Sequence, residues 1–501
     1  MENIIELNTK KYLGRKQIVL DCKFQIENGK EVYKVLAVSG KPILNEVNVT
    51  GGDVGFLGKV NLKLVYLTES GERECLNCIA DFNESYESDE IEIGDAVAID
   101  LKVVDVTTPS IKANEVKVAI IIDAVISICK NIKCEQEDTK ENVYYKTQEK
   151  QIANKVCLVN DTFDLAEEFK INGDLKCVLN IDSDIIVKES YCGSGFAVVE
   201  GDVVANIVYE DESDELKMYK TTFPFKQETT LEDVNKECIV CADAKPLEYL
   251  SKCTVSQGDN CNIIKYEVPI NINGIVYENK TIIVNDDAYS EKYTLKNEYV
   301  KYDAIKEIVS CNLEDSVKGE LPLKDGENAT LLLNLFNGVE VSSSYMENEK
   351  LCVEGVVNST IIYKDEQNSE RSVIAEFPYI CKLNKIELEK ADEISVKASI
   401  VDMDITIKNG NLELVTKLVF NVIGVQKDTL NILISASEES ERPQKDCAME
   451  VVFINEDKPL WDLGKMLGVD VGKIEKQNPT LDGFAKKGDK IVVYYGFTKV
   501  G

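Results

Sequence analysis

Among the residues of the chain, the cysteines come closest in type and spacing to the ligands of a metal site or the thiols of a redox site. The chain contains 16 cysteines and no histidine. Two Cys-x-x-Cys pairs, Cys75/Cys78 and Cys238/Cys241, have a spacing that zinc and redox sites use. Both pairs lie in strand-like sequence, where residues three apart point to opposite faces. We therefore expect reduced thiols that pack as small hydrophobic side chains and no metal site, with zinc binding as the alternative.

The lack of histidine excludes much catalytic chemistry. Ser-His and Cys-His nucleophile pairs and histidine metal ligands cannot form. Carboxylate pairs such as Asp402 and Asp404 remain, but with 89 acidic residues most must be solvated. The glycine-rich stretch at 51–59 lacks a phosphate-loop spacing, because Asp53 stands where the first glycine is needed. We expect a protein that is not an enzyme and needs no cofactor.

Charge and hydropathy limit the classes of molecule that the protein can bind and the compartment in which it is expected. Against 57 Lys and Arg residues, the 89 acidic residues give a net charge of −32, which disfavours nucleic acids and anionic membranes. The N-terminal sequence lacks the apolar core of a secretory signal. The most apolar stretch, 116–128, is interrupted by Lys117 and Asp123 and reads as a strand pair. We therefore expect a cytoplasmic protein with no membrane insertion.

A repeated pattern occupies most of the chain. Three segments, Gly58–Tyr66, Gly201–Tyr209 and Gly355–Tyr363, align without gaps. Each has a leucine 22 positions before its glycine, and each is followed by an acidic turn and then an aromatic residue. The leucines are Leu36, Leu179 and Leu333, and the aromatic residues are Phe82, Phe223 and Phe377. A pattern that recurs in this way is typical of a chain built from several copies of one structural unit.

The repeated segments alternate with a period of two. Val60, Leu62 and Leu64 fall on one face of the first segment, and polar residues fall on the other, which predicts a half-buried strand. Later alternating runs, 264–272 and 412–422, have the same character. The fold class expected is mainly β, with three tandem antiparallel β-sandwich-like repeats at 1–145, 146–300 and 301–434.

The C-terminal part differs from the repeats. Residues 435–447 are polar and contain Pro443, so we expect a flexible linker. The pattern over 448–498 predicts strand, helix, helix, strand, and residues 449–501 contain eight acidic and eight basic residues. The only tryptophan of the chain, Trp461, should supply much of the buried area of this small βααβ module.

The terminal stretch resembles a LysM domain. The matching residues are Leu460-Trp461, Gly468-Val469, Ile474, Asn478-Pro479 and the stretch 488–491. The usual Gly-Asp-Thr turn of the family, which lines its N-acetylglucosamine groove, is here Asp457-Lys458-Pro459. Proline removes a backbone donor from that turn, which argues against glycan binding.

The upstream repeats resemble the SPOCS domain of sporulation coat proteins. The resemblance rests on the three Gly-to-Tyr segments with their acidic turns and aromatic residues. Several such units, a polar linker and a final LysM module give an arrangement similar to the clostridial SipL family of spore-coat morphogenetic proteins. That resemblance implies a mother-cell protein at the forespore surface whose LysM end docks to the coat ATPase SpoIVA.

The sequence is compatible with two functions. The first is a non-enzymatic scaffold for spore coat assembly, docking to a SpoIVA-like partner. The second is a binder of peptidoglycan that uses the LysM groove. For either function the binding residues expected on the LysM surface are Lys458, Pro459, Leu460, Trp461, Asn478, Pro479, Thr480, Leu481 and Asp482. Core packing is the alternative role for Leu460 and Trp461, and a helix C-cap is the alternative for Asn478.

Overall fold

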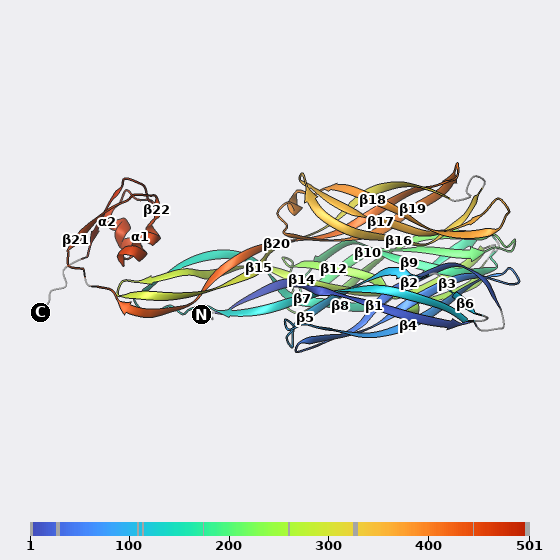
Figure 1. Ribbon diagram of the computed structural model, residues 1–501, viewed down its shortest axis with the longest axis horizontal. Helices are drawn as coiled ribbons and strands as arrows, with labels where there is room; N and C mark the ends of the chain where they lie inside the picture. Colours follow the sequence, from blue (N-terminus) through green and yellow to red (C-terminus); the bar gives the residue numbers. More distant parts are fainter. Residues whose placement is uncertain are drawn as a thin grey trace.

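The computed structural model describes residues 4–26, 31–107, 110–112, 115–173, 175–258, 261–323, 329–443 and 445–495. Almost all of its elements are antiparallel β-strands, and the two α-helices of the described residues lie near the C-terminus. The expectation of a mainly β protein is confirmed. The strands form an elongated head that narrows into a stalk, with a small module at the far end of the stalk (Figure 1).

The first unit of the head contains two sheets. A meander of three strands has the order β2-β3-β4, and a second sheet has the order β1-β7-β5 with β6 beside β7. The region 116–128, expected to form a strand pair, is instead part of the single long strand β7. The strands are β1 Ile4–Gln25, β2 Val32–Thr50, β3 Asp53–Thr68, β4 Arg73–Glu87, β5 Ala96–Val106, β6 Ser110–Lys112 and β7 Glu115–Glu135.

The second unit repeats this order of strands. Its meander is β9-β10-β11, and its long first and last strands, β8 and β14, pair with each other beside β12 and β13. The elements are β8 Val143–Asn172, β9 Cys177–Cys192, β10 Phe196–Glu210, β11 Leu216–Thr230, β12 Ile239–Pro246, the 3-10 turn η1 Glu248–Leu250, β13 Lys252–Gly258 and β14 Cys261–Ser290.

The third unit has the meander β16-β17-β18 and the sheet β15-β20-β19. Its elements are β15 Tyr293–Pro322, β16 Thr330–Glu347, β17 Lys350–Lys364, β18 Glu370–Asn384, the 3-10 turn η2 Ile386–Leu388, β19 Glu393–Lys408 and β20 Asn411–Glu441. Unit boundaries expected after residues 145 and 300 thus lie inside strands β8 and β15.

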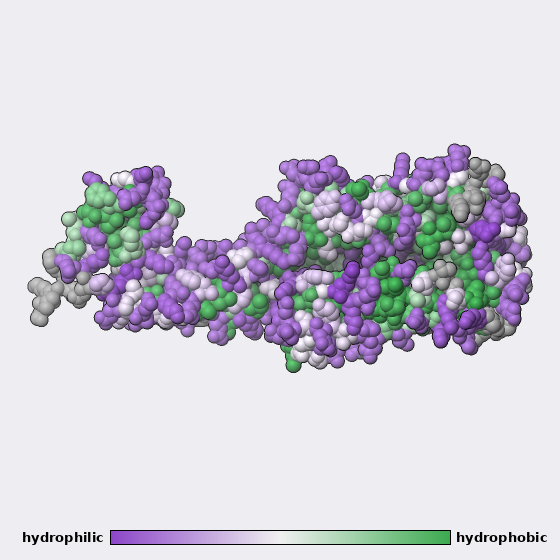
Figure 2. All heavy atoms as spheres, in the orientation of Figure 1, coloured by the Kyte–Doolittle hydropathy of each residue, from purple (hydrophilic) through white to green (hydrophobic). Residues whose placement is uncertain are grey.

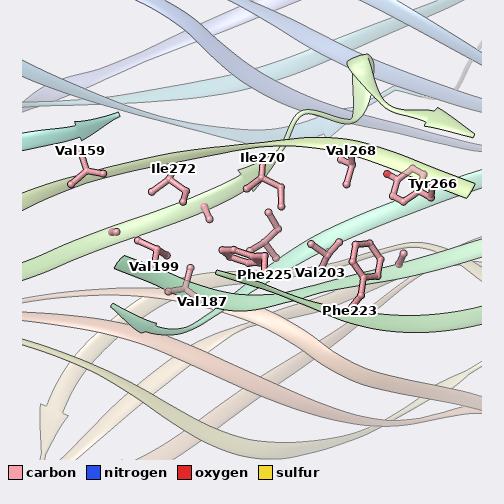
Figure 3. Close-up of a cluster of buried hydrophobic side chains, with 14 of the residues drawn as sticks. Val159, Val187, Val199, Val203, Phe223, Phe225, Tyr266, Val268, Ile270 and Ile272 are labelled. Atoms are coloured by element: carbon pink, nitrogen blue, oxygen red, sulfur yellow. The ribbon is translucent and has the colours of Figure 1, made fainter. Parts of the chain in front are cut away.

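Each unit has an apolar core between its two sheets. In the second unit, Ile264, Tyr266, Val268, Ile270 and Ile272 alternate inward from β14 and are at most 1% exposed. They face side chains of the meander such as Val203, Phe223 and Phe225 (Figure 3). The alternating runs of the sequence therefore mark the strands that bury one face in this core.

The repeated glycine lies under an aromatic ring. Gly58 pairs with Phe82 across β3 and β4, Gly201 with Phe225, and Gly355 with Tyr379. A Cβ atom on Gly58 would lie 2.1 Å from the Phe82 ring and 2.6 Å from the carbonyl oxygen of Ile43. Only glycine fits so close an approach of ring and backbone. In the second and third units the covering ring lies two residues beyond Phe223 and Phe377, the aromatic residues of the sequence pattern.

The central strand of each meander, β3, β10 or β17, is buried on both faces over its repeated segment, which corrects the expectation of half-buried strands. In β3, Asn61, Lys63 and Val65 are only 4–6% exposed although their neighbours already face the core. Their face contacts the other units. The apolar cluster where the three meanders meet contains Leu36, Ala37, Val65, Val208, Leu333, Leu335 and Ile362, with Leu179 packed against it. The three leucines that precede the repeated glycines therefore come together at the centre of the head.

Arg73 joins all three units beside this central cluster. Its Nη1 donates to Glu210 Oε1 of the second unit at 2.7 Å, and its Nε donates to Glu370 Oε2 of the third unit at 3.1 Å. The side chains of Arg73, Glu210 and Glu370 are 12%, 5% and 11% exposed. Arg73 thus neutralises Glu370 and shares Glu210 with Lys176, whose Nζ lies 3.4 Å from Glu210 Oε2.

The stalk continues the long strands of the head. It consists of the strand ends at 4–12 with 128–135, 143–155 with 277–290, and 293–305 with 427–441. Its core is the cluster of Ile5, Leu7, Cys134, Ile152, Ile282, Val284, Ala304, Leu430 and Ile432. Residues 435–441, expected to be a flexible linker, pair with β15 as the end of β20. Only a short connection, 442–448, remains before the terminal module.

Gly58→Ala should destabilise the first unit by about 2–3 kcal/mol, because the added methyl group must displace the Phe82 ring or the β2 backbone. Gly55→Ala in the same strand is the control, since its nearest neighbour would be a backbone oxygen at 3.8 Å. Urea unfolding followed by circular dichroism measures both. Equal midpoints for the two variants would contradict this role of the ring.

Arg73→Ala should destabilise the head by about 3–5 kcal/mol, because Glu370 loses its cation and Glu210 keeps only Lys176 at 3.4 Å. Lys382→Ala serves as the control, because its ion pair with Glu347 is about half exposed and such pairs contribute about 0–1 kcal/mol. The midpoint of urea unfolding distinguishes the two. A loss no larger than that of the control would show that the three units do not depend on Arg73.

Candidate functional site

Besides the contact of Arg73 with Glu210 and Glu370, two regions of the described structure concentrate polar side chains away from water. One is a cluster of charges between the first and second units, and the other is the contact between the terminal module and the stalk. The cysteine pairs do not form a third. Burial raises the pKa of Cys75 and Cys78 to about 11 and that of Cys241 to about 12, so these thiols are weak nucleophiles. All sixteen cysteines are free thiols, and within the described ranges no three potential ligands gather around a metal position.

The charge cluster is formed by Lys41 and Lys63 of the first unit with Asp182 and Glu248 of the second. Lys41 Nζ lies 2.7 Å from Asp182 Oδ1 and 3.1 Å from Glu248 Oε1, and Lys63 Nζ lies 2.6 Å from Glu248 Oε2. The backbone N–H of Ser183 also donates to Glu248 at 2.6 Å.

Every charge of this cluster has an opposite partner. Burial on its own would raise the pKa of Glu248, but Lys41, Lys63 and the Ser183 N–H outweigh it and lower that pKa to about 2. Glu248 therefore stays ionised at neutral pH and does not act as a general acid or base there. We assign the cluster to holding the first two units together.

The terminal module folds around its own small core. Strands β21 Met449–Phe453 and β24 Lys490–Tyr494 pair antiparallel, and helices α1 Leu460–Leu467 and α2 Val471–Gln477 pack on one face of that sheet. Two short strands, β22 Lys458–Pro459 and β23 Phe484–Ala485, pair beside them. The core side chains are Ile454, Leu460, Leu463, Leu467, Val469, Ile474, Ala485, Ile491 and Val493.

Local sequence signals set the ends of the two helices. Gly468, at φ 66°, takes the left-handed conformation that ends α1. The Asp470 side chain accepts a hydrogen bond from the N–H of Gly472 and caps the start of α2. Asn478 ends α2, where its side chain donates to the carbonyl oxygens of Ile474 and Val492 and accepts from the Val492 N–H at 2.8–2.9 Å. Asn478 therefore joins α2 to β24.

The structure separates the expected binding residues into two groups. Leu460 is 1% exposed and belongs to the module core, Asn478 is 9% exposed, and Leu481 packs against the core. Lys458 and Pro459 are partly exposed, and Pro479, Thr480 and Asp482 are exposed. Only the second group is accessible to a partner. Trp461 belongs to neither group.

Trp461 lies against the stalk and is not a core residue of the module, which corrects the sequence-based expectation. Its indole N–H donates to Asp287 Oδ2 at 2.9 Å, and Lys465, one helical turn later, lies 2.6 Å from Asp287 Oδ1. The ring of Tyr289 meets the indole edge-to-face at 4.8 Å. The Tyr289 hydroxyl donates to the carbonyl oxygen of Val469 at 2.9 Å.

Further contacts fix the module at the tip of the stalk. The N–H of Asp470 donates to Glu291 Oε1 at 3.0 Å, and Arg442 Nη2 donates to the carbonyl oxygen of Lys465 at 2.8 Å. Burial on its own would raise the pKa of Asp287, but hydrogen bonds from Lys465, Trp461 and Tyr299 outweigh it and lower that pKa. Asp287 is thus held as an anion between module and stalk.

The stalk residues of this contact were not found from the sequence. Asp287 is one of 89 acidic residues, and nothing in its local sequence distinguishes it. The signal that was present is the unusual composition of 284–293, which combines two aspartates with two tyrosines. Within the described part of the chain, no helix is long and apolar enough to cross a membrane.

Comparison with known proteins identifies one region. Residues 174–255 match the family model described as SipL, SPOCS domain. The match covers the meander of the second unit and strand β12, and extends into β13. Comparison with curated proteins gives no match. The matched region indicates a sporulation-related protein, and SipL is not a known family of enzymes.

Asn478→Ala should lower the stability of the terminal module by about 1–3 kcal/mol, because two carbonyl oxygens and one N–H lose their buried partner. Thr480→Ala, an exposed position two residues away, is the matched control. Hydrogen exchange of the α2 and β24 amides as a function of urea gives the midpoint of the module itself, whereas Trp461, which lies against the stalk, would also respond to undocking. Identical midpoints would mean that Asn478 does not hold α2 to β24.

Proposed function

We propose that this protein is a non-enzymatic scaffold of the bacterial spore coat, which acts in the mother cell at the forespore surface. The match of the second unit to the SipL SPOCS domain is the observation that carries the proposal. The three units are proposed to be three copies of that domain. Their common strand order and their glycine–aromatic pairs support this view.

The terminal module is proposed to be a LysM domain that docks to a SpoIVA-like coat ATPase. Its strand-helix-helix-strand order supports the assignment. The position of the module at the end of an extended stalk supports a docking role, because a partner can reach it without contact with the acidic head (Figure 1). Lys458, Pro459, Pro479, Thr480 and Asp482 are proposed as the accessible contact residues.

A binding assay with purified proteins tests this function. The full chain, immobilised through its head, should retain the purified ATPase, and a chain that ends at residue 441 should not. Lys458→Ala and Asp482→Ala should each reduce retention severalfold, because both side chains lie on the accessible surface, and Lys382→Ala in the head should not. Retention that is the same for the full and truncated chains would contradict docking through the module.

The same proteins distinguish the glycan alternative. The full chain should remain in the supernatant when mixed with insoluble peptidoglycan, because Pro459 offers no backbone donor in the groove. Sedimentation of the chain with peptidoglycan that chitin oligomers reverse would favour the LysM groove as a glycan site and would count against the scaffold.

A further inference from the structure

The contact between module and stalk joins two bodies that are each complete without it. The module core contains no stalk residue, and the stalk clusters contain no module residue. Beyond the connection at 442–448, the contact rests on a few side chains of 287–291 against α1 and the two residues that follow Gly468. Such a contact can open while both bodies remain folded.

The stalk presents its side of the contact as an extended segment. Asp287 and Tyr289 are two residues apart in β14 and therefore point to the same side, with Glu291 following them. A bulge at Asp286, just before them, leaves that residue out of the pairing. Asp286 instead accepts from Gln148 at 2.9 Å and lies 3.3 Å from Lys146, both within the stalk. Asp287 and Asp286 therefore face different partners although they are neighbours in the chain.

The module receives this segment on one face of α1. Trp461 and Lys465 are four residues apart and lie next to each other on the helix surface. Together they offer an indole N–H, an ammonium group and an aromatic edge to a single carboxylate and a single tyrosine ring. Tryptophan, tyrosine and paired charges in a partly buried patch are typical of the residues that dominate protein–protein contacts.

We propose that Trp461, Lys465 and the Val469 carbonyl form a protein-binding face of the module, and that the stalk tip occupies this face within the same chain. The docked state is then autoinhibited for a partner that uses this face. Such a partner must bring an extended segment with a carboxylate and, two residues later, an aromatic ring, and must displace Asp287 and Tyr289. This inference rests on the proposed function, because it concerns regulation of the docking module.

The position of the module favours the stalk tip as its resting occupant. The connection at 442–448 is short, and Arg442 is bonded both to the stalk and to α1. A short tether gives the stalk segment an effective concentration on the order of millimolar at the module. Only a partner that binds more strongly, or that has several contacts, can compete.

Release of the module can be followed in the full chain by its single tryptophan. Asp287→Ala should undock the module and make Trp461 severalfold more accessible to acrylamide, because both partners on α1 lose their carboxylate. Asp286→Ala is the matched control and should quench like the wild type. Circular dichroism should be the same for all three proteins. Equal quenching of Asp287→Ala and the wild type would overturn the proposal.

A peptide of residues 284–293, VNDDAYSEKY, tests recognition by the exposed face. Fluorescence anisotropy of the labelled peptide should show saturable binding to the Asp287→Ala chain and at least severalfold weaker binding to the wild type, whose face is covered. A peptide with the Asp287→Asn change should not bind, nor should the native peptide bind a chain that carries both Asp287→Ala and Trp461→Phe. Equal binding to wild type and Asp287→Ala, or no binding to either, would overturn the proposal.

The ATPase assay separates this inference from the proposed function. If the module is autoinhibited, the ATPase contacts the covered face of Trp461 and Lys465 in addition to the accessible residues. Asp287→Ala should then retain severalfold more ATPase than the wild type, and Asp286→Ala should retain the same amount. Retention that does not change with Asp287→Ala would overturn autoinhibition and leave the scaffold function in place. Absence of retention by both proteins would contradict the scaffold function, while the quenching and peptide experiments would still decide whether the face recognises the stalk segment.

Discussion

Burial of the central strand of each meander on both faces is the constraint on which the rest of the head depends. A strand such as β3 packs its inward residues in the core of its own unit and places Val65 in the cluster shared by all three. No unit can leave without exposing that cluster to water, so the three units are joined by the same apolar burial that folds each of them. The space-filling view shows hydrophilic residues along the outer edges of the head and over much of the stalk, with hydrophobic residues gathered over the middle of the visible face of the head (Figure 2).

Charge at the contacts between units is structural. The members of the central cluster are apolar side chains, so they set how closely the units approach but give them little preference for one angular arrangement. Arg73 with Glu210 and Glu370, and Lys41 and Lys63 with Glu248, supply directional contacts. In a chain of net charge −32, each of these lysines and the arginine neutralises carboxylates that come from another unit. The cost of burying the acids is thereby reduced.

The stalk couples the head to the terminal module. The strands that close each unit are the same strands that extend into the stalk, so the base of the stalk is fixed by the cores of the head. Each first strand has a bulge near this transition, at Leu13, Val156 and Lys306, where an extra residue changes the direction of the strand. Because β20 remains paired to Glu441, the module stands at a defined position and is not a freely diffusing domain on a flexible linker.

The sequence determined the elements, and the tertiary structure decided their surroundings. Period-two alternation predicted which strands face a core, because side-chain spacing along a strand is a local property. The recurring glycines and leucines showed that the same segment occurs three times in the chain. The alternation could not show that Asn61 and Lys63 are buried, since their burial comes from a neighbouring unit far away in the sequence. It could not place Trp461 either. A tryptophan on a short helix reads as core, and only the stalk tip, with Asp287 and Tyr289 about 170 residues earlier in the chain, makes it a contact residue.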